Sequence, residues 1–478
     1  MIEVCHSHIN IHNYTLGDCK KLENFLSVWD NVSFTYKWQN FKYDEEKKVL
    51  TVPRAIRVNR LQFLFKEKEL KINTTPNPKG KATFKCTTKP RDDKQVEAIS
   101  SLLGEIDETN DTTERMLCLQ TGGGKTYCTI NALSKLKTRS IIIVDKEKIA
   151  QQWKKEFLQF TDLDEDDIYI ISGSDSIDAL MKKKVTDIKY KVFIALHQTL
   201  SSYSNTKSLD DMCKKFKIGC TVFDEAHCYA AAMFNFNFNT NIALTIYLTA
   251  TPNRSDQFED KVYQASLGDI YKFGLEDKFQ DPYHNIYYIS YNTNPTYGEQ
   301  CKCQSKRGFN INEFSDYTID KKWDSFYEIV TKLIDIALKK PEYGKITVIL
   351  HKNDHIIKMK QALEADYPDV SIGTFCGLIS SNKEREKELS KKIILSTDKS
   401  MGKAVDIENL QFVIMTVPTS SQVIAEQTLG RLRKLKDGRN VMYFDLTDVG
   451  FKTCVHQRKL RRKILDKKAK SIHTMNLN

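Results

Sequence analysis

The sequence lacks the features that would place it in a membrane, in a secreted state or among disordered chains. Its 478 residues include only 19 glycines and 10 prolines, so it is neither fibrous nor of low complexity. No stretch approaches the roughly 20 consecutive apolar residues that a membrane-spanning helix needs. The N-terminus has neither the basic start nor the apolar core of a secretory signal. We therefore expect a cytoplasmic protein with no membrane partner.

Cysteine is present, but not in a pattern that binds metal. The 12 cysteines are scattered along the chain, and the closest pair, Cys301 and Cys303, has no second pair to complete a four-ligand zinc site. In a reducing compartment such cysteines remain thiols. The sequence therefore predicts neither disulfides nor a structural metal.

The overall composition is that of a globular protein and carries a surplus of positive charge. Apolar residues make up 40% and charged residues 28% of the chain. The length suggests about three domains. Lysine and arginine outnumber the acids by 73 to 62, which gives a formal charge of +11. A surplus of this sign favours a polyanionic partner, and we expect the basic residues to gather where that partner binds.

Two long stretches alternate short β-branched apolar runs with helical patterns, which is typical of a parallel sheet covered by helices. Helical periodicity is clear at residues 149–160 and 355–366. The runs expected to form strands are residues 116–119, 140–144, 191–196, 221–223 and 244–248, and then 346–350, 370–375, 392–395, 412–417 and 441–444. The predicted fold class is α/β, with two units of similar size.

Composition shifts set the predicted domain boundaries. Residues 1–88, called the N-terminal module below, read as a small α+β accessory domain that ends in a Thr-, Pro- and Asn-rich linker, and we expect it to bind substrate. The first α/β unit is expected at residues 89–340, with an insertion or linker at about 292–320. Proline and glycine at 341–344 punctuate the end of a helical stretch, so the second unit is placed at 341–478, with a basic C-terminal tail.

The segment Gln-Thr-Gly-Gly-Gly-Lys-Thr at 120–126 lies between a predicted strand and a helical segment, which is the context of a phosphate-binding loop. Its glycines let successive backbone amides point at one set of phosphate oxygens. Lys125 can reach the β- and γ-phosphates, and the Thr126 hydroxyl can coordinate Mg²⁺. The residues expected to bind the nucleotide here are Thr121, Gly122, Gly123, Gly124, Lys125 and Thr126. Leu119 stands where the usual pattern has a small residue.

A pair of carboxylates lies where such a site needs it. Asp224 and Glu225 directly follow the strand expected at 221–223. Asp224 can hold the Mg²⁺ shell with Thr126, while Glu225 orients and deprotonates the attacking water. Together with the loop, the pair predicts a magnesium-dependent nucleoside triphosphate hydrolase.

Three motifs in order resemble those of the superfamily 2 helicases and translocases: Gly-Lys-Thr at 124–126, Asp-Glu-Ala-His at 224–227 and Leu-Thr-Ala-Thr-Pro at 248–252. Within that superfamily the chain is most similar to the group of XPB-type helicases, phage UvsW-type branch-migration helicases and the poxvirus transcript-release helicase. The resemblance covers about residues 89–462. It implies two RecA-like lobes with an ATP cleft between them, ATP and Mg²⁺ as cofactors, a monomer, and a viral or phage source in a bacterial host or virus-infected cell.

The resemblance also implies roles for residues around the motifs. Arg91 and Gln95 match the adenine-side motif, and His227 matches a relay between the nucleotide and nucleic-acid faces. Trp153 we expect in the core. The positions that contact the nucleic-acid backbone in the family correspond here to Lys146, Gln198, Thr199, Thr249, Thr251 and Thr397. Such contacts use short polar side chains against phosphate and bind without reading the base sequence.

In the second unit, residues 396–407 resemble the motif that bridges ATP and nucleic acid. Gly402 and Asp406 match its nucleotide-binding positions, Asp406 as the acid that contacts the ribose. The usual glycine two residues before the acid is Ala404, and Glu408 replaces a common proline. The backbone there is expected to differ slightly from the family's.

Residues 427–434 resemble the family's arginine-finger motif, with Gln427 at its start and Arg431 in the transition-state role. The second finger is either Arg433 or Lys434. If the segment is one helix, Lys434 lies on the same face as Gln427 and Arg431, while Arg433 points away.

These features predict an ATP-dependent DNA helicase or translocase that remodels branched DNA, such as forks and junctions, in replication, recombination or repair. An RNA helicase or a transcript-release ATPase remains open. So does a nucleic-acid-binding scaffold with a vestigial ATPase, against which the intact catalytic residues argue. Residues 458–470, with eight basic residues and one acid, suit phosphate contact or form a solvated tail.

Overall fold

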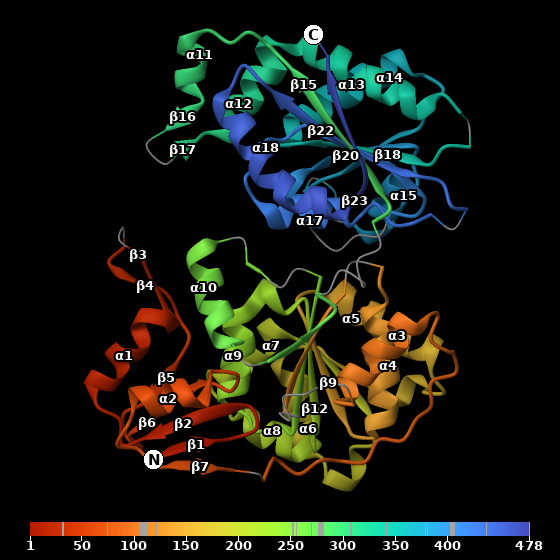
Figure 1. Ribbon diagram of the computed structural model, residues 1–478. Coiled ribbons are helices and arrows are strands. Elements are labelled where there is room, and N and C mark those ends of the chain that lie inside the picture. Colours follow the sequence, from red (N-terminus) through yellow and green to blue (C-terminus); the bar gives the residue numbers. More distant parts are fainter. Residues whose placement is uncertain are drawn as a thin grey trace. The chain divides into compact units, whose positions relative to one another are not determined.

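The computed structural model of the chain forms two compact units, Met1–Phe279 and Gln280–Asn478 (Figure 1). Each has its own parallel sheet and hydrophobic core, and each is described by itself. The residues that the structure describes are 1–30, 33–73, 75–105, 113–119, 122–250, 253–254, 256–268, 270–275, 282–305, 308–340, 342–377, 379, 381–401, 407–435 and 437–477.

The N-terminal module is built on a five-stranded sheet in the order β5-β6-β2-β1-β7, with β3 and β4 as a separate hairpin. Its elements are β1 (Ile2–Val4), β2 (His8–His12), α1 (Leu16–Leu26), β3 (Ser27–Asp30), β4 (Thr35–Gln39), β5 (Lys42–Asp44), β6 (Val49–Pro53), α2 (Val58–Leu64) and β7 (Leu70–Ile72). Alternate residues of β2, Ile9 and Ile11, lie in one core with Leu50 of β6 and Leu22 of α1. The predicted α+β character of this region is confirmed.

The rest of the first unit is a parallel sheet of seven strands in the order β10-β11-β9-β12-β13-β8-β14. Its elements are α3 (Asp93–Leu103), β8 (Glu114–Cys118), α4 (Lys125–Leu136), β9 (Ser140–Val144), α5 (Glu147–Phe160), η1 (Glu165–Asp167), β10 (Ile168–Ile171), α6 (Ser174–Lys182), η2 (Val185–Asp187), β11 (Val192–Leu196), α7 (His197–Ser204), α8 (Leu209–Phe216), β12 (Cys220–Asp224), η3 (Ala226–Tyr229), α9 (Ala230–Phe238), β13 (Leu244–Thr249), α10 (Gln257–Ser266) and β14 (Tyr271–Phe273).

Helices cover both faces of this sheet, which explains why its central strands are apolar throughout. In β9, Ile141 and Ile143 pack into one core, while Ile142 and Val144 pack into the other. The helices α3, α4 and α5 contribute to the second of these cores, and α6 to α10 contribute to the first (Figure 1). A strand buried on both faces is recognisable from sequence as a continuous β-branched run.

The second unit repeats this architecture with a parallel sheet in the order β19-β20-β18-β21-β22-β15-β23. Its elements are β15 (His284–Tyr291), α11 (Tyr297–Lys302), β16 (Gln304–Ser305), β17 (Gly308–Phe309), α12 (Ile311–Asp316), η5 (Tyr317–Lys321), α13 (Trp323–Leu338), β18 (Lys345–Leu350), α14 (Asn353–Asp366), β19 (Ile372–Phe375), α15 (Asn382–Leu389), β20 (Ile393–Thr397), α16 (Asp398–Met401), β21 (Leu410–Met415), α17 (Gln422–Leu429), β22 (Val441–Asp448), α18 (Lys452–Leu465), η6 (Asp466–Lys468) and β23 (Ala469–Asn476). The predicted α/β class with two parallel-sheet units is confirmed.

The second unit begins earlier than the boundary that the sequence places at residue 341. The strand β15 pairs with β22 and β23, and α13 packs Phe326 and Leu333 into the same core as Ile346 of β18. The proline- and glycine-containing turn marks only the end of α13, because such residues end a helix whether or not a domain ends there. The predicted loop at 292–320 instead contains α11, a short hairpin and α12, with Phe314 packed on Phe451.

Among the described residues, no helix combines the length and the apolar character that crossing a membrane would require.

Candidate functional site

The glycine loop lies between the end of β8 and the start of α4, as predicted. Gly122 and Gly124 adopt left-handed φ angles of +83° and +87°, which side-chain-bearing residues rarely adopt. A Cβ atom at Gly124 would lie 2.3 Å from the side-chain nitrogen of Gln95. The backbone turn therefore requires glycine at these two positions. Thr121 lies outside the described residues.

Lys125 opens α4 and turns its side chain back into the loop. Its ammonium donates a hydrogen bond to the carbonyl oxygen of Leu119, with Nζ 3.0 Å from O. The Leu119 side chain is buried in the core of the first sheet. Leu119, which departs from the usual pattern, therefore contributes its backbone carbonyl to the loop, while its side chain packs into the core and away from the loop.

The acidic pair lies at the carboxyl end of β12, next to β13. The indole nitrogen of Trp153 donates to Asp224, with Nε1 2.9 Å from Oδ2. Burial, followed by the neighbouring Glu225 carboxylate, raises the pKa of Asp224 to about 6, and the Trp153 bond and the Lys125 charge only partly oppose this. Glu225 itself has a left-handed φ of 49°, a strained conformation of the kind that clusters at functional sites.

His227 connects this pair to the end of β13. Its Nδ1 atom lies 2.8 Å from the Thr249 hydroxyl and 3.6 Å from a carboxylate oxygen of Glu225. Burial lowers the pKa of His227, so the imidazole is neutral at pH 7. Its backbone carbonyl accepts a hydrogen bond from the guanidinium of Arg254, which the sequence did not single out. The structure therefore brings the predicted relay residue His227 together with Thr249.

The predicted adenine-side residues flank the glycine loop. Gln95 is buried on α3, and its side-chain oxygen accepts from the backbone N–H of Arg91 at 2.8 Å. Arg91 is 64% exposed and pairs with Asp92 at 2.9 Å. Gln95 therefore supports Gly124 and the backbone of Arg91, and contact of either side chain with adenine stays a prediction.

Lys146 and Gln198 meet at one carboxylate on the surface of the first unit. Gln198 donates to the Asp145 carboxylate at 3.3 Å and to its backbone carbonyl at 3.1 Å, and Lys146 lies 3.4 Å from the same carboxylate. Thr199 follows on α7 and is partly exposed. These residues lie at the carboxyl ends of β9 and β11, which are neighbouring strands. A phosphate-contacting surface at this position remains a prediction.

Two other predicted nucleic-acid contacts are buried. Thr249 is fully buried and bound to His227, and Thr397 is 7% exposed, with its hydroxyl bonded to Ser400 at 2.8 Å. Contact of either hydroxyl with a phosphate stays a prediction. Thr251 lies outside the described residues.

In the second unit, the predicted finger segment is not one helix. The helix α17 ends at Leu429, so Gln427 is helical and Arg431 is not. The guanidinium of Arg431 donates to the carbonyl of Met401 at 3.2 Å. Arg433 and Lys434 are both exposed, and the argument from a shared helical face does not apply to them. Gly402 and Asp406 lie outside the described residues.

The basic C-terminal stretch is not a free tail. In α18 the guanidinium of Arg461 is completely buried and pairs with Asp445 of β22 at 2.7 Å. Arg458 donates to Thr447 and Ser290 at 2.7 and 2.9 Å. After α18 the chain continues into β23, an edge strand of the sheet. Part of the positive charge therefore holds α18 against the sheet.

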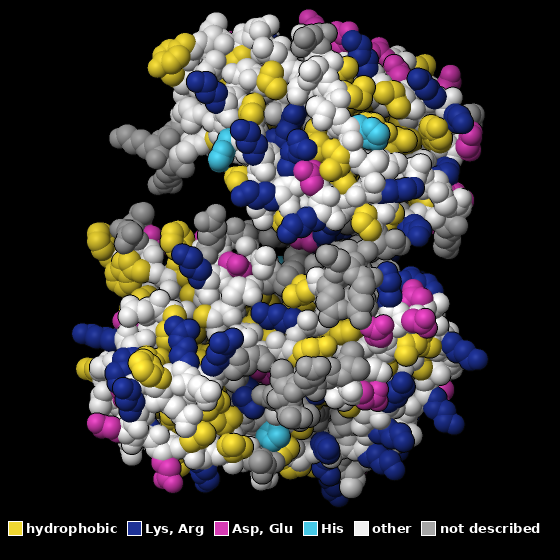
Figure 2. All heavy atoms as spheres, viewed as in Figure 1, with side chains coloured by type: hydrophobic (Ala, Val, Ile, Leu, Met, Phe, Trp, Pro, Cys, Tyr) yellow, Lys and Arg dark blue, Asp and Glu magenta, His cyan; other side chains and the backbone are white. Residues whose placement is uncertain are grey.

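The rest of the positive charge is dispersed on the visible surface. On the face shown in Figure 2, lysine and arginine side chains are scattered over both units and mixed with acids. No single basic patch is visible in this view. On this face, the net charge of +11 therefore does not mark a nucleic-acid surface.

The residues present fit a nucleotide and its metal ion. Within the described ranges, no group of three or more His, Cys, Asp or Glu side chains is arranged to bind a metal. A Mg²⁺ ion that accompanies a nucleotide needs only one or two carboxylates, because the phosphates supply further oxygens. Asp224, with its raised pKa, is an under-neutralised carboxylate of the required kind, beside the glycine loop and Lys125.

Sequence reasoning missed two residues that shape this site. Trp153 was expected in the core, and it is buried, but its N–H also orients Asp224. Tyr229 has its hydroxyl 2.7 Å from the carbonyl of Asp224, and its ring stacks on His197 at 4.5 Å. His197 in turn lies 3.2 Å from Asp145. No sequence signal marks Tyr229 beyond its closeness to the acidic motif.

Parts of the chain are similar to known proteins. Residues 88–254 match the family model of the type III restriction enzyme res subunit. The DNA 3'-5' translocase XPB2 of Sulfurisphaera tokodaii is 27% identical over 246 residues, which is 50% of this chain and 47% of that protein. Transcript termination protein A18 of Yaba-like disease virus is 23% identical over 373 residues, 74% of this chain and 73% of that protein.

The fold is also that of solved structures. A fragment of an HsdR subunit of a type I restriction enzyme from Vibrio vulnificus matches 80% of this chain and 68% of that chain, with a TM-score of 0.53 and 16% identity. The chain spans less than half the length of the archaeal relatives, from 20% to 47%. The motifs, their geometry and these matches support a superfamily 2 helicase or translocase, similar to XPB and the poxvirus helicase-like proteins.

Proposed function

We propose that the chain is an ATP-driven translocase that moves on DNA and remodels branched structures such as forks and junctions. The observation that carries the proposal lies in the first unit. The nucleotide residues and the Lys146–Gln198 surface both follow the carboxyl ends of neighbouring parallel strands. Ligand sites of parallel sheets form at that edge.

In the proposed chemistry the residues of this unit divide the work. Lys125 and the loop amides bind the phosphates, Asp224 and Thr126 hold the metal ion, and Glu225 takes the proton of the attacking water. Mg²⁺ bound there would neutralise charge on the β- and γ-phosphates. In the second unit, Arg431 is proposed to stabilise charge on the γ-phosphate, with Arg433 or Lys434 as an additional cation.

A chain of contacts supports coupling between nucleotide and nucleic acid within the first unit. The Tyr229 hydroxyl reaches the backbone of Asp224, its ring stacks on His197, and His197 contacts Asp145. Asp145 is the residue that binds Gln198 and Lys146. A movement of the acidic motif can therefore shift the proposed phosphate-contacting surface through these packed side chains.

A substrate panel tests the proposal. The full chain is assayed for ATP hydrolysis and strand displacement with single strands, forks, four-way junctions, displacement loops and RNA duplexes. We expect the strongest ATPase stimulation and product formation with forks and junctions. Greater stimulation by RNA duplexes than by any DNA would contradict the assignment of DNA, and ATP hydrolysis unaffected by every nucleic acid would contradict a translocase.

A second candidate function, release of transcripts from a polymerase, is favoured by one observation. The transcript termination protein A18 matches 74% of this chain, more than XPB2 does. Incubation of the chain and ATP with stalled elongation complexes measures it directly. Release of labelled transcript without activity on junction substrates would favour this function over branch remodelling.

A further inference from the structure

The hairpin of β3 and β4 in the N-terminal module carries a bulge at Lys37. Val28 of β3 faces Trp38, and the next residue, Trp29, faces Tyr36, so Lys37 has no opposing residue. Consecutive residues of a regular strand point to opposite faces. An extra residue changes this direction, and such bulges serve to redirect side chains. As a result, both Lys37 and Trp38 contact the segment that follows β13.

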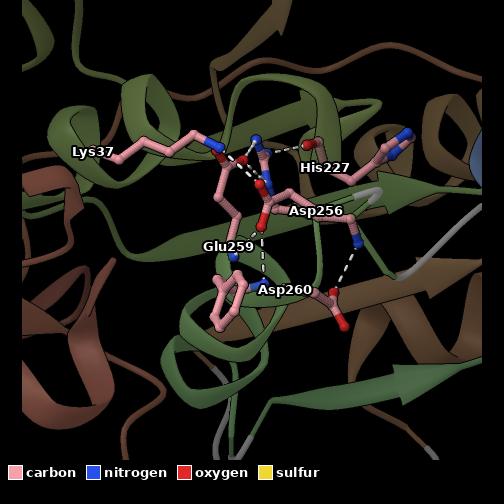
Figure 3. Close-up of polar contacts among 7 residues, drawn as sticks. Lys37, His227, Asp256, Glu259 and Asp260 are labelled. Carbon is pink, nitrogen blue, oxygen red and sulfur yellow. Dashed lines mark hydrogen bonds and ion pairs between the residues drawn. The ribbon is translucent and has the colours of Figure 1, made fainter. Parts of the chain in front are cut away.

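Lys37 contacts an ion-pair network that Figure 3 shows, and Trp38 packs against the same network. The Lys37 ammonium lies 2.7 Å from an oxygen of Asp256 and 2.8 Å from an oxygen of Glu259. The other carboxylate oxygen of Glu259 accepts from Arg254 at 2.7 Å (Nη2) and 3.2 Å (Nε). The Trp38 ring lies over the same guanidinium, with its centroid 5.5 Å from Cζ. The hairpin therefore holds Arg254 both through Glu259 and directly.

The same guanidinium of Arg254 also contacts the acidic motif. Its Nη1 atom donates to the backbone carbonyl of His227, and its backbone N–H donates to Asp260 at 2.7 Å. His227 in turn contacts Thr249 and lies beside Glu225. Two ion-pair steps therefore connect Lys37 of the N-terminal module to the carbonyl of a motif residue.

The two steps differ in their exposure to water. The Arg254 and Glu259 side chains are 20% and 16% exposed, so the two hydrogen bonds from the guanidinium to one Glu259 oxygen are largely sheltered from water. The Lys37 side chain is 47% exposed, and water competes for its bonds. Its hydrogen bonds to Asp256 and Glu259 raise the pKa of Lys37, so it carries its charge at neutral pH. The outer contact can break and reform while the inner pair persists.

We propose that Lys37 and Arg254 are positioning residues that make ATP turnover depend on how the N-terminal module is docked. Lys37 and Trp38 hold Arg254 against the His227 carbonyl, and this fixes the acidic motif in its working geometry. Nucleic acid or a protein that moves the hairpin changes turnover without touching the nucleotide. The inference rests on the proposed ATPase function and adds a regulatory route to it.

The first experiment compares lysine variants of the full chain in fork-stimulated ATP hydrolysis. Lys37→Met is expected to lower the stimulated kcat by between about twofold and thirtyfold, with an unchanged KM for ATP, because the coupling lies outside the nucleotide-binding residues. Lys37→Arg keeps the charge and is expected to retain most of the stimulation. The control is Lys42→Met, which removes a neighbouring lysine of the module that contacts Asn239 of the first unit at 2.8 Å but lies outside the network.

A double-mutant cycle supplies the second readout. If Lys37 acts through Arg254, adding Lys37→Met to Arg254→Ala changes the stimulated kcat by less than about twofold, since the route is already broken. Independent, multiplicative losses would overturn the proposal. Equal losses in Lys37→Met and Lys42→Met, or no loss in either, would also overturn it. A wild-type chain with no fork-stimulated ATPase would refute the proposed function itself, and the coupling with it.

Discussion

The two parallel sheets share an architecture and differ at their carboxyl edges. In the first unit this edge carries an ammonium, two carboxylates and a buried imidazole, and burial shifts the pKa values of Asp224 and His227 away from their usual values. In the second unit the corresponding edge carries the bonded hydroxyls of Thr397 and Ser400 and a His351–Asp398 pair at 3.4 Å. It also carries Asp448, whose pKa burial raises. The described charged residues of the second unit with a proposed catalytic role are Arg431 and either Arg433 or Lys434.

Both units also bury charge, but in different ways. Arg461 and Asp445 of the second unit are completely enclosed and face each other at 2.7 Å. Asp224 of the first unit accepts a hydrogen bond from the neutral indole N–H of Trp153, and its pKa is raised. A buried charge that is paired holds the fold together, whereas one that is under-neutralised is ready for a cation. The contrast separates structural from functional charge.

The largest expected effect is at Lys125. Lys125→Ala removes the cation proposed to bind the β- and γ-phosphates, and we expect fork-stimulated ATP hydrolysis to fall by about a thousandfold or more. Steady-state ATPase assays measure the loss. The control is Lys135→Ala, an exposed lysine near the end of the same helix, which should keep wild-type turnover. Turnover of Lys125→Ala within a few fold of the wild type would contradict the assignment of the nucleotide site to the first sheet.

The next effect concerns the paired charge of the second unit. Arg461→Met leaves Asp445 buried without its partner, and we expect the unfolding free energy of this unit to fall by about 3–5 kcal/mol. Urea unfolding of the full chain, followed on the second unit's transition, measures the loss. Adding Asp445→Leu should restore most of the stability, because both charges are then gone. A loss below about 1 kcal/mol would show that the pair is not structural.

Removing the charge of Asp224 is expected to raise the unfolding free energy, whereas removing that of Arg461 lowers it. Its pKa is raised above the usual 3.8 to about 6, so the ionised carboxylate destabilises the folded state above pH 6, and this cost disappears below about pH 4. Asp224→Asn should therefore stabilise the nucleotide-free chain at pH 7.5 by about 1–3 kcal/mol while abolishing ATP hydrolysis. Thermal unfolding across pH 4 to 8 tests this. A destabilised variant at pH 7.5 would contradict the account of Asp224.

The smallest effect is expected at Trp153. Trp153→Phe removes the N–H that orients Asp224 and lowers its pKa, a contribution of about 1 kcal/mol, so kcat should fall by about fivefold. The pH–rate profile should shift to higher pH, because the pKa of Asp224 rises further. Trp323→Phe, which alters a stacked tryptophan of the second unit, is the control. An unchanged profile would show that the indole N–H has no role in the site.

The sequence was sufficient to predict the central strands of the first sheet and most strands of the second, including the edge strand β19. It missed β10, β14, β15 and β23. Strands such as β9 are buried on both faces and appear as continuous β-branched runs. The edge strands β14 and β23 contain lysine, serine or histidine, since one side of an edge strand faces solvent, and their sequences resemble loops. Because β15, which lies next to the edge strand β23, was not predicted as a strand, the start of the second unit was predicted too late in the sequence.

The site was predictable where one short segment carries the chemistry. The glycine loop and the acidic pair are each contiguous, and their roles follow from residue type and position after a strand. Trp153 and Asp224 are separated by 71 residues, and Lys37 and Asp256 by 219. Contacts of that separation depend on the fold and leave no local pattern. The burial of Thr249 and Thr397 is likewise visible only in three dimensions.

The central claim is that the carboxyl edge of the first sheet hydrolyses ATP with Glu225 as the base. Its most direct test is the comparison of Glu225→Gln with the wild-type chain, in ATP binding and in fork-stimulated turnover. We predict an ATP affinity within about threefold of the wild type and a turnover lower by at least about a hundredfold. Wild-type turnover in Glu225→Gln would contradict the account.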